Sequence, residues 1–359
     1  MQRKVLFFSG SFQYGVADNF IQGLIQALNA YHYDVIKIDL SNKAELKQQL
    51  SAVMEYEIAF TFSLNALGND LLPYLAKVRA APFYTLLLDH PLHSLQRFFG
   101  THMTLLCVDL QHVRFALALS MQAHFFPHAV TVDDLEPRAN ASARQGILFP
   151  ASYFDPNHHW PAIQQYFPLA AGLMQQNSID NITELLLELD FMQTNKAPRI
   201  ALDKHSITLL VYCDLYLRGR KRNQLITQCA EAGISLNIIG NGWIPERQIA
   251  VHQYLPAENF TVLQQRIANS RYVLHQAPGF THALHERLLY PLLHNTPVLT
   301  QDNTFLQQYF SNNNSICFYR DVNHLKAILD SANEVYDEQG RQLALQKEQW
   351  LHRLQHLLL

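Results

Sequence analysis

Short apolar runs alternate with amphipathic segments through the first third of the chain. The apolar runs, which we predict to be buried strands, are Lys4–Phe8, Val35–Ile38, Ile58–Phe62, Phe83–Leu88, Leu105–Val108 and Ala123–Phe126. The segments between them, which we predict to be helices, are Ala17–Asn29, Ala44–Val53, Leu71–Val78 and Val113–Met121. Strands that alternate with helices of about ten residues are typical of βαβ units and a parallel sheet. The pattern therefore predicts a doubly wound α/β domain over residues 1–140.

This alternation stops at a polar segment, Asp133–Arg144, which has the composition of an interdomain linker. A strand is predicted at Gly146–Ala151, but residues 156–205 contain no convincing strand after it. They hold three successive segments with helical character, Trp160–Tyr166, Leu169–Gln175 and Asn181–Met192. We therefore predict a helical insertion over residues 156–205.

Strands and helices alternate again after the insertion, which predicts a second Rossmann-like domain over residues 141–332. The strands expected there are Ile207–Cys213, Ser235–Ile239, Arg271–Gln276, Pro297–Thr300 and Ile316–Phe318, and the helices are Lys221–Ala232, Val262–Ala268 and Leu325–Ala332. Residues 333–359 predict one long C-terminal helix that packs back toward the first domain. The expected fold class is thus α/β, with two doubly wound domains.

Polar side chains gather in the stretch Asn269–Asn303, after the strand that ends at Gln276. A loop around Pro278 and Gly279 follows that strand, and a helix is predicted to start near Thr281. Ligands bind at the carboxyl ends of strands in open α/β sheets, and the amino terminus of a helix favours anions. The loop and the first helical turn contain Gln276, His282, His285, Glu286 and Arg287. This stretch is therefore our candidate ligand site.

Pro291 lies inside the helix predicted in that stretch. A proline in a helix interior removes one backbone hydrogen bond and costs about 3 kcal/mol. We therefore expect the helix to kink or stop near Tyr290.

Composition narrows the class of protein. The 359 residues are 48% hydrophobic, which is enough for two sizeable cores, and the net charge of −3 gives no pull toward nucleic acid. The four cysteines are scattered without a CxxC pair, as is usual in a reducing compartment. No apolar run approaches the roughly 18 residues that a membrane helix needs. We expect a cytoplasmic protein without a transmembrane segment.

Several short motifs occur in an order that resembles a known family. They are Leu86–Pro91, Cys107–Asp109, Phe126–Ala129, Arg218–Arg222, Ile238–Trp243 and Asn269–Thr300. In this order they resemble the GT-B glycosyltransferases, most closely the CgeB-like group of spore-maturation proteins. The resemblance implies an enzyme that moves a sugar from a nucleotide-sugar, UDP- or GDP-linked, to an unidentified acceptor (a protein, glycan or lipid). It implies no cofactor and no metal.

The resemblance also suggests which residues hold the donor. A Glu on the helix of the candidate stretch, here Glu286, hydrogen-bonds the ribose hydroxyls in such enzymes, and a carboxylate can accept two hydroxyl protons at once. Four cations occupy five residues from Arg218 to Arg222, and Arg218 and Arg222 are the candidates for the donor diphosphate. The plainer alternatives are a carboxylate that only stabilises a helix start and a run of solvated surface cations.

Further candidates come from the turns that follow predicted strands. In the second domain, Gly240, Asn241 and Gly242 allow a ligand to approach the backbone, with Trp243 as a contacting aromatic or as a core residue. Gly279, His282 and His285 are candidates for the sugar and phosphate, although the spacing of the two histidines also suits a metal or a structural role. In the first domain, Gly10 is placed on the acceptor side, and Asp89 or His90 is the candidate catalytic base.

Two other classes of function remain open. The first is a non-catalytic protein that binds a nucleotide or sugar on a degenerate GT-B fold. His285 and Pro291, which depart from the usual sequence motif of the family, favour it. A metal-dependent hydrolase that uses some of the 18 histidines lacks an HxH or HExxH cluster.

Overall fold

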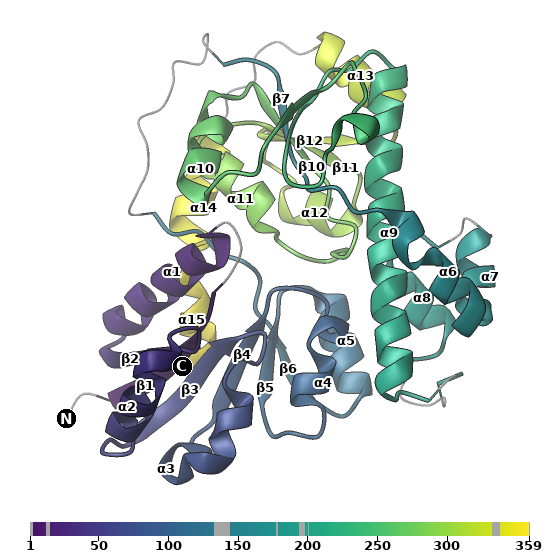
Figure 1. Ribbon diagram of the computed structural model, residues 1–359. Coiled ribbons are helices and arrows are strands. Elements are labelled where there is room, and N and C mark those ends of the chain that lie inside the picture. The colour runs from purple at the N-terminus through teal and green to yellow at the C-terminus, as the bar shows by residue number, and fades with distance from the viewer. Residues whose placement is uncertain are drawn as a thin grey trace. The chain divides into compact units, whose positions relative to one another are not determined.

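The computed structural model describes residues 3–11, 15–132, 144–176, 179–193, 198–199, 201–331 and 338–358. The chain forms two compact units, each of which is discontinuous in sequence (Figure 1). The first unit comprises Met1–His128, Leu186–Val211 and Trp350–Leu359, and the second comprises Ala129–Leu185 and Tyr212–Gln349. Residues 133–143 of the expected linker lie outside the described residues, and the linear domain boundaries stay a prediction.

A six-stranded parallel sheet, in the order β2-β1-β3-β4-β5-β6, is the centre of the first unit. Its strands are β1 (Arg3–Ser9), β2 (Tyr33–Asp39), β3 (Ile58–Leu64), β4 (Phe83–Leu87), β5 (Thr104–Cys107) and β6 (Gln122–Phe125). The strand β1 is fully buried from Val5 to Phe8, as its apolar run predicts. The chain leaves β1 toward β2 and later returns to β3 on the other side, so the order of strands reverses at β1.

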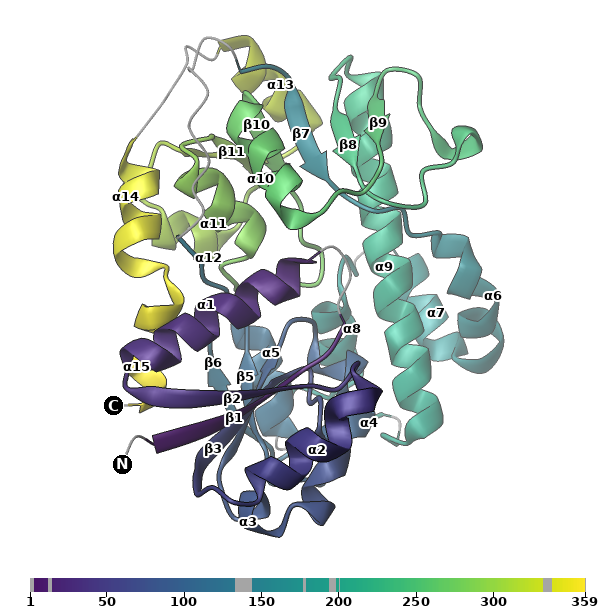
Figure 2. The same ribbon diagram turned by 60° about the vertical axis from the view of Figure 1, so that its left-hand side comes forward.

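Helices cover both faces of this first sheet. They are α1 (Val16–Ala30), α2 (Lys43–Val53), α3 (Ala76–Arg79), α4 (Leu95–Phe98), α5 (Leu110–Ala118) and α15 (Trp350–Leu358), with short 3-10 helices at Asn69–Tyr74 and Pro91–His93. The helices α1 and α15 lie side by side, and α2 lies on the opposite face of the sheet (Figure 2). The ring of Phe20 on α1 is 5.3 Å from that of Trp350. The last helix of the chain is thus part of the first unit.

The second unit contains another six-stranded parallel sheet, in the order β12-β11-β10-β7-β8-β9. The strands are β7 (Ile147–Pro150), β8 (Asn237–Ile239), β9 (Gln253–Leu255), β10 (Tyr272–His275), β11 (Val298–Gln301) and β12 (Ile316–Tyr319). Read from β9, this is the strand order of dinucleotide-binding Rossmann domains, and it reverses between β7 and β10. Two six-stranded parallel sheets confirm the expected pair of Rossmann-like folds.

The described part of the second unit contains several helices. They are α6 (Pro156–Tyr166), α7 (Pro168–Gln175), α8 (Ile182–Glu188), α9 (Lys204–Glu231), α10 (Phe260–Asn269), α11 (Glu286–Leu293), α12 (Thr304–Tyr309), α13 (Val322–Ser331) and α14 (Glu338–Lys347), of which α8 and α9 begin in one unit and end in the other. The helices α10, α11 and α14 lie on one face, and α9 and α13 lie on the other (Figure 1). Leu225 and Ile226 of α9 share one buried cluster with Leu325 of α13 and with Phe149 of β7.

The strand predicted at Ile207–Cys213 is wrong, because these residues belong to the 28-residue helix α9. The buried residues Leu210, Cys213 and Leu217 recur every three to four positions, which is the period of a helix buried along one side. A short run of apolar residues does not by itself distinguish a buried strand from a buried helix. The correction moves Arg218 and Arg222 from the end of a strand to the middle of a long helix.

The expected single C-terminal helix is also wrong, since α14 ends at Lys347 and α15 starts at Trp350. Between them, Gln349 forms a parallel β-bridge with Val130, whose amide donates to the carbonyl of Glu348. A β-bridge requires an extended backbone at Gln349, so one continuous helix cannot run through this residue. The helix expectation for residues 333–337 lies outside the described residues. Among the described helices, none is both long enough and apolar enough to cross a bilayer.

Candidate functional site

The loops that follow three neighbouring strands of the second unit carry most of the predicted donor residues. The strands β10, β7 and β8 are adjacent, and their carboxyl ends lead into residues 276–280, 151–154 and 240–243. The middle of α9 lies against the second of these loops, since the Arg222 guanidinium donates to the carbonyl of Ser152 at 2.6 Å. The order of strands reverses between β7 and β10, which is where α/β proteins bind nucleotides.

Arg218 and Arg222 are one helical turn apart on α9 and face this region. The Nε of Arg218 is 2.8 Å from a carboxylate oxygen of Asp214, and its guanidinium lies 5.7 Å from the ring centre of Phe280. Gly219 lets the helix approach the loop, because a Cβ there would lie 2.8 Å from the carbonyl oxygen of Phe154. The same helix thus brings two guanidinium groups to loops that follow β7 and β10.

Arg222 is 5% exposed, which is unusual for a cation without a carboxylate partner of its own in the described contacts. Burial, and then the positive charges of Arg287 and Arg218, lower the pKa of Arg222 to about 9. Three guanidinium groups therefore repel one another here, with Asp214 and Glu286 as the nearby carboxylates. An anion bound among them would relieve that repulsion, and a diphosphate has the charge and the oxygen atoms to do so.

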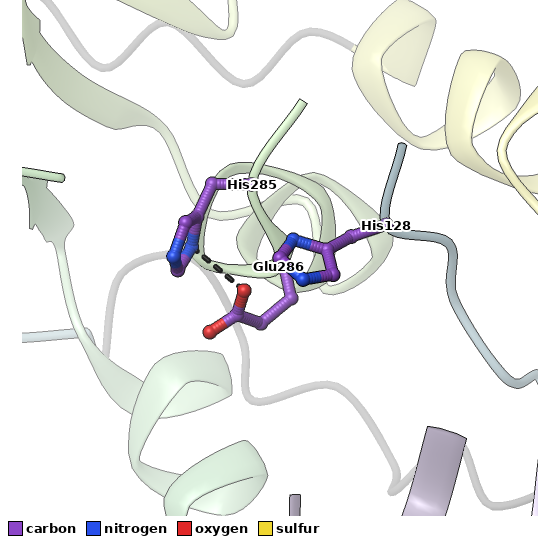
Figure 3. Close-up of side chains that lie close together, drawn as sticks. All are labelled: His128, His285 and Glu286. Carbon is purple, nitrogen blue, oxygen red and sulfur yellow. Dashed lines mark ion pairs between the residues drawn. The ribbon is translucent and has the colours of Figure 1, made fainter. Parts of the chain in front are cut away.

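Glu286 is the first residue of α11, so the helix begins five residues later than the predicted start at Thr281. Figure 3 shows its carboxylate turned toward the ring of His285, with 2.7 Å between Oε2 and Nδ1, and Arg287 Nε lies 3.7 Å from Oε1. The amide of Arg287 donates to Nδ1 of His285 at 3.3 Å, so the side chain of His285 caps the start of α11.

Pro291 does not end α11, so of the expected kink or stop near Tyr290, the stop is wrong. The helix continues to Leu293, and the carbonyl of Pro291 accepts a hydrogen bond of 2.8 Å from the amide of Thr296. The proline is buried among apolar residues of the helix. Packing of this face thus outweighs the lost backbone hydrogen bond.

His282 lies in the loop before α11, so it does not share a helical face with His285 as the predicted i, i+3 spacing required. Its Nδ1 is 3.1 Å from the hydroxyl of Thr281, and its ring is 5.8 Å from that of Phe305. His275, at the end of β10, is the histidine that packs near His285, with ring centres 5.7 Å apart. Burial lowers the pKa of His275 well below its usual range, helped by the charges of His285 and Arg287. His275 is therefore neutral at pH 7.

The turn after β8 contains the other predicted donor residues. Gly242 has a φ of 83°, which is the left-handed region that favours glycine. The indole nitrogen of Trp243 donates to the carbonyl of Ala151 at 2.7 Å, and its ring packs on Tyr153 and Tyr254. The backbone amide of Asn241 donates to the hydroxyl oxygen of Ser152 at 3.2 Å. These contacts hold the turn after β8 against the loop after β7.

Gly240 is where that turn approaches the β7 loop most closely. A Cβ at Gly240 would lie 2.4 Å from the carbonyl oxygen of Ala151 and 2.6 Å from the amide of Ser152, both backbone atoms. We expect Gly240→Ala to lower the free energy of unfolding by about 1–3 kcal/mol, as measured by urea denaturation. Gly172→Ala on α7 is the control, because no heavy atom lies within 4 Å and alanine favours a helix. Equal stability of the two variants would contradict this packing.

The predicted acceptor-side residues all belong to the first unit. Gly10 follows β1, and a Cβ there would be 3.3 Å from Leu67 in the turn after β3. His90 is 1% exposed, and its ring packs on His112 at 4.6 Å and on Phe115 at 5.0 Å. Its Nδ1 accepts from the amide of Leu92 and so caps the short helix Pro91–His93. Asp89, which is half-buried, is the more accessible of the two candidate bases.

Three features of these regions were missed at the level of sequence. Asp214 directly follows the run assigned to a strand, and His275 was assigned only to the predicted strand Arg271–Gln276 and not to the candidate site. In the first unit, Asn65 and Ala66 both have positive φ, of 49° and 58°, directly after β3. This strained turn is held by Thr85, whose hydroxyl oxygen accepts from the amide of Ala66 at 2.7 Å. A sequence signal existed only for Asn65, a residue type that tolerates this backbone conformation.

Comparison with known proteins agrees with this arrangement. Residues 220–358 match a family model described as glycosyl transferase-like. Comparison with curated proteins finds no match. The structure is similar to sucrose-phosphate synthase from Thermosynechococcus elongatus, with a TM-score of 0.54 and 12% identity over 99% of this chain and 98% of that chain.

Two further solved structures show the same likeness. HepE of Anabaena in complex with UDP and glucose has a TM-score of 0.53 and 9% identity, over 99% of this chain and 98% of that one. AviGT4, a glycosyltransferase involved in avilamycin A biosynthesis, has a TM-score of 0.53 and 10% identity, over 99% and 96%. At such identities the likeness concerns the fold. The two Rossmann-like units thus have the GT-B fold of these solved structures, and residues 220–358 carry the glycosyl transferase-like match.

Proposed function

We propose that the protein transfers a sugar from a UDP- or GDP-linked donor, bound on the second unit, to an acceptor hydroxyl or amine. The observation that carries the proposal is the convergence of Arg218, Arg222 and Arg287 beside Glu286, at the place where the strand order reverses. Cations at that place suit a diphosphate, and a carboxylate suits the two ribose hydroxyls. The solved structure of HepE contains UDP and glucose, which supports a UDP-linked donor.

The proposed chemistry is a single exchange of bonds at the anomeric carbon. An acceptor atom bonds to this carbon, the bond to the donor phosphate oxygen breaks, and the nucleoside diphosphate leaves with the bonding electrons. Arg218 and Arg222 stabilise the charge that develops on the departing diphosphate. Asp89 or His90 of the first unit would take the acceptor proton. No step needs a metal ion or another cofactor, and metal independence is part of the proposal.

Two finer assignments belong to the same proposal. The order of motifs from Leu86–Pro91 to Asn269–Thr300 supports membership of the CgeB-like group. Free thiols at all four cysteines, three of them buried, support a cytoplasmic location.

A donor screen tests the proposal. The protein is incubated with UDP- and GDP-sugars and a panel of acceptors, with and without a chelator, and products are identified by mass spectrometry. We expect release of nucleoside diphosphate from one donor class and a mass gain of one sugar on an acceptor, unaffected by the chelator. Hydrolysis that the chelator abolishes would instead favour the metal-dependent hydrolase.

The second candidate is a nucleotide- or sugar-binding protein without transferase activity. The structure offers one observation in its favour, which is that the imidazole of His90 is buried beside the ring of Phe115 rather than exposed as an acceptor base. Donor binding without turnover across the whole acceptor panel would favour this candidate.

A further inference from the structure

Asp214 is a buried carboxylate on α9, one helical turn before Arg218. Its side chain is 1% exposed, and its Oδ2 lies 2.8 Å from Nε of Arg218. Burial and then the charge of Asp214 raise the pKa of the neighbouring Cys213 thiol, so the thiol is neutral and does not compete as a counter-ion. A buried carboxylate is costly unless it is paired. The pairing with Arg218 is therefore the reason that this position tolerates an acid.

The opposite side of the same guanidinium lies against the loop after β10. A Cβ at Gly279 would be 2.6 Å from Nη2 and 2.8 Å from Cζ of Arg218. Gly279 is not among the residues with positive φ, so this position requires glycine for space and not for its backbone conformation. The ring of Phe280 completes the contact, 5.7 Å from Cζ. Asp214 and the loop thus hold Arg218 from two sides.

This arrangement determines where the terminal nitrogens of Arg218 point. The guanidinium is planar, so the ion pair at Nε and the close approach of Nη2 to Gly279 together restrict the plane in which Nη1 and Nη2 lie. With Nη2 at Gly279, that plane extends to the β10 loop, where the order of strands reverses and where Gln276 donates to the carbonyl of Lys221 at 3.2 Å. A flexible arginine in this region would have to lose side-chain entropy on binding, whereas Arg218 is already ordered.

We infer that Asp214 is a positioning residue for sugar transfer: it holds Arg218 so that its terminal nitrogens face the donor diphosphate. The inference rests on the proposed function. A second consequence is electrostatic, because the Asp214 carboxylate offsets part of the repulsion among Arg218, Arg222 and Arg287 before any anion binds. A pair needed only for stability has no such requirement, since buried ion pairs are often replaceable by apolar residues without loss of stability.

The test compares UDP and GDP binding, by calorimetry, for the wild-type chain and for Asp214→Asn, with sugar transfer measured where a donor is known. Asparagine keeps the shape and an acceptor oxygen but removes the charge. We expect binding of the nucleoside diphosphate to weaken by roughly ten- to a hundredfold, the effect of one charged hydrogen bond. In an Arg218→Lys background, Asp214→Asn should have little further effect, because the planar group that it orients is already gone.

Glu258→Gln is the matched control, since Glu258 forms a close ion pair with Arg266 in the same unit. It should alter stability but leave binding unchanged. In Gly279→Ala the added Cβ would clash with the same guanidinium from the loop side, so this variant should weaken binding by a similar factor. It keeps the test valid if Asp214→Asn does not fold. Wild-type affinity in a folded Asp214→Asn, or in Gly279→Ala, would overturn the inference. If the wild type itself binds neither UDP nor GDP, the proposed function fails instead.

Discussion

Replacing Arg218 by lysine is expected to lower kcat for sugar transfer by roughly a hundredfold. Lysine keeps a positive charge beside Asp214, whereas alanine would leave a buried carboxylate without its partner at a cost of about 3–5 kcal/mol. What lysine lacks is the planar group whose terminal nitrogens lie at Gly279. The lower kcat should therefore reflect weaker stabilisation of the departing diphosphate. Initial rates at saturating donor measure this kcat.

Arg220→Lys is the matched control for that experiment. Arg220 lies on the same helix, but its two terminal nitrogens donate to the carbonyls of Met174 and Ile179, which belong to the helical region after β7. This variant should lose stability and retain kcat. Equal rate losses in the Arg218 and Arg220 variants would show that the helix as a whole, and not one guanidinium, determines the rate.

Replacing Arg222 by methionine is expected to separate stability from donor binding. Burial lowers the pKa of Arg222 to about 9, so the folded protein disfavours the cation more than the unfolded chain does. Below pH 9 the group is protonated in both states, and the whole cost is present at neutral pH. The cost diminishes only as the pH rises above 9. We therefore expect the melting temperature at pH 7 to be unchanged or higher in Arg222→Met, while UDP binding weakens roughly tenfold or more.

Thermal denaturation with and without UDP measures both effects. The wild type should gain thermal stability from UDP, because the anion relieves the repulsion on Arg222, and the variant should gain less. The hydrogen bond to the Ser152 carbonyl and the contact with the Phe154 ring are lost in the variant and act in the other direction. A large fall in melting temperature with unchanged UDP affinity would mean that Arg222 is structural.

Except for β9, the strands could be predicted from sequence, because each of them is a short apolar run with turn residues at its ends. The failure at Ile207–Cys213 has the same origin, since seven apolar or β-branched residues fit a buried strand as well as a buried helix. Tertiary packing distinguishes the helix from a strand here, since one side of α9 packs on the sheet and on α13. Glycine occurs at position 219 of this helix because the backbone of Phe154 lies too close for a Cβ. The short strand β9 and the helix α12 have too few residues to produce a pattern.

The residues of the proposed donor site differ in how strongly the sequence indicates them, for a physical reason. Glu286, Arg218 and Arg222 carry unusual charge or match family motifs, so the sequence indicates them. Asp214 carries no signal, because its role depends on Arg218 one helical turn away, and the residues just before it were assigned to a strand. The spatial need for Gly279 becomes visible only when the side chain of Arg218 is placed against it.

Calorimetry on Glu286→Gln tests whether Glu286 and the arginines bind a nucleoside diphosphate. Glutamine keeps the size of the side chain. It removes the negative charge and replaces one of the two carboxylate oxygens that accept hydrogen bonds from the ribose hydroxyls. The wild type should bind UDP or GDP, and the variant should bind it roughly tenfold or more weakly. Both proteins should bind inorganic pyrophosphate equally, because pyrophosphate has no ribose. Absence of UDP and GDP binding by the wild type at millimolar concentration, or an equal loss for pyrophosphate in the variant, would contradict the claim.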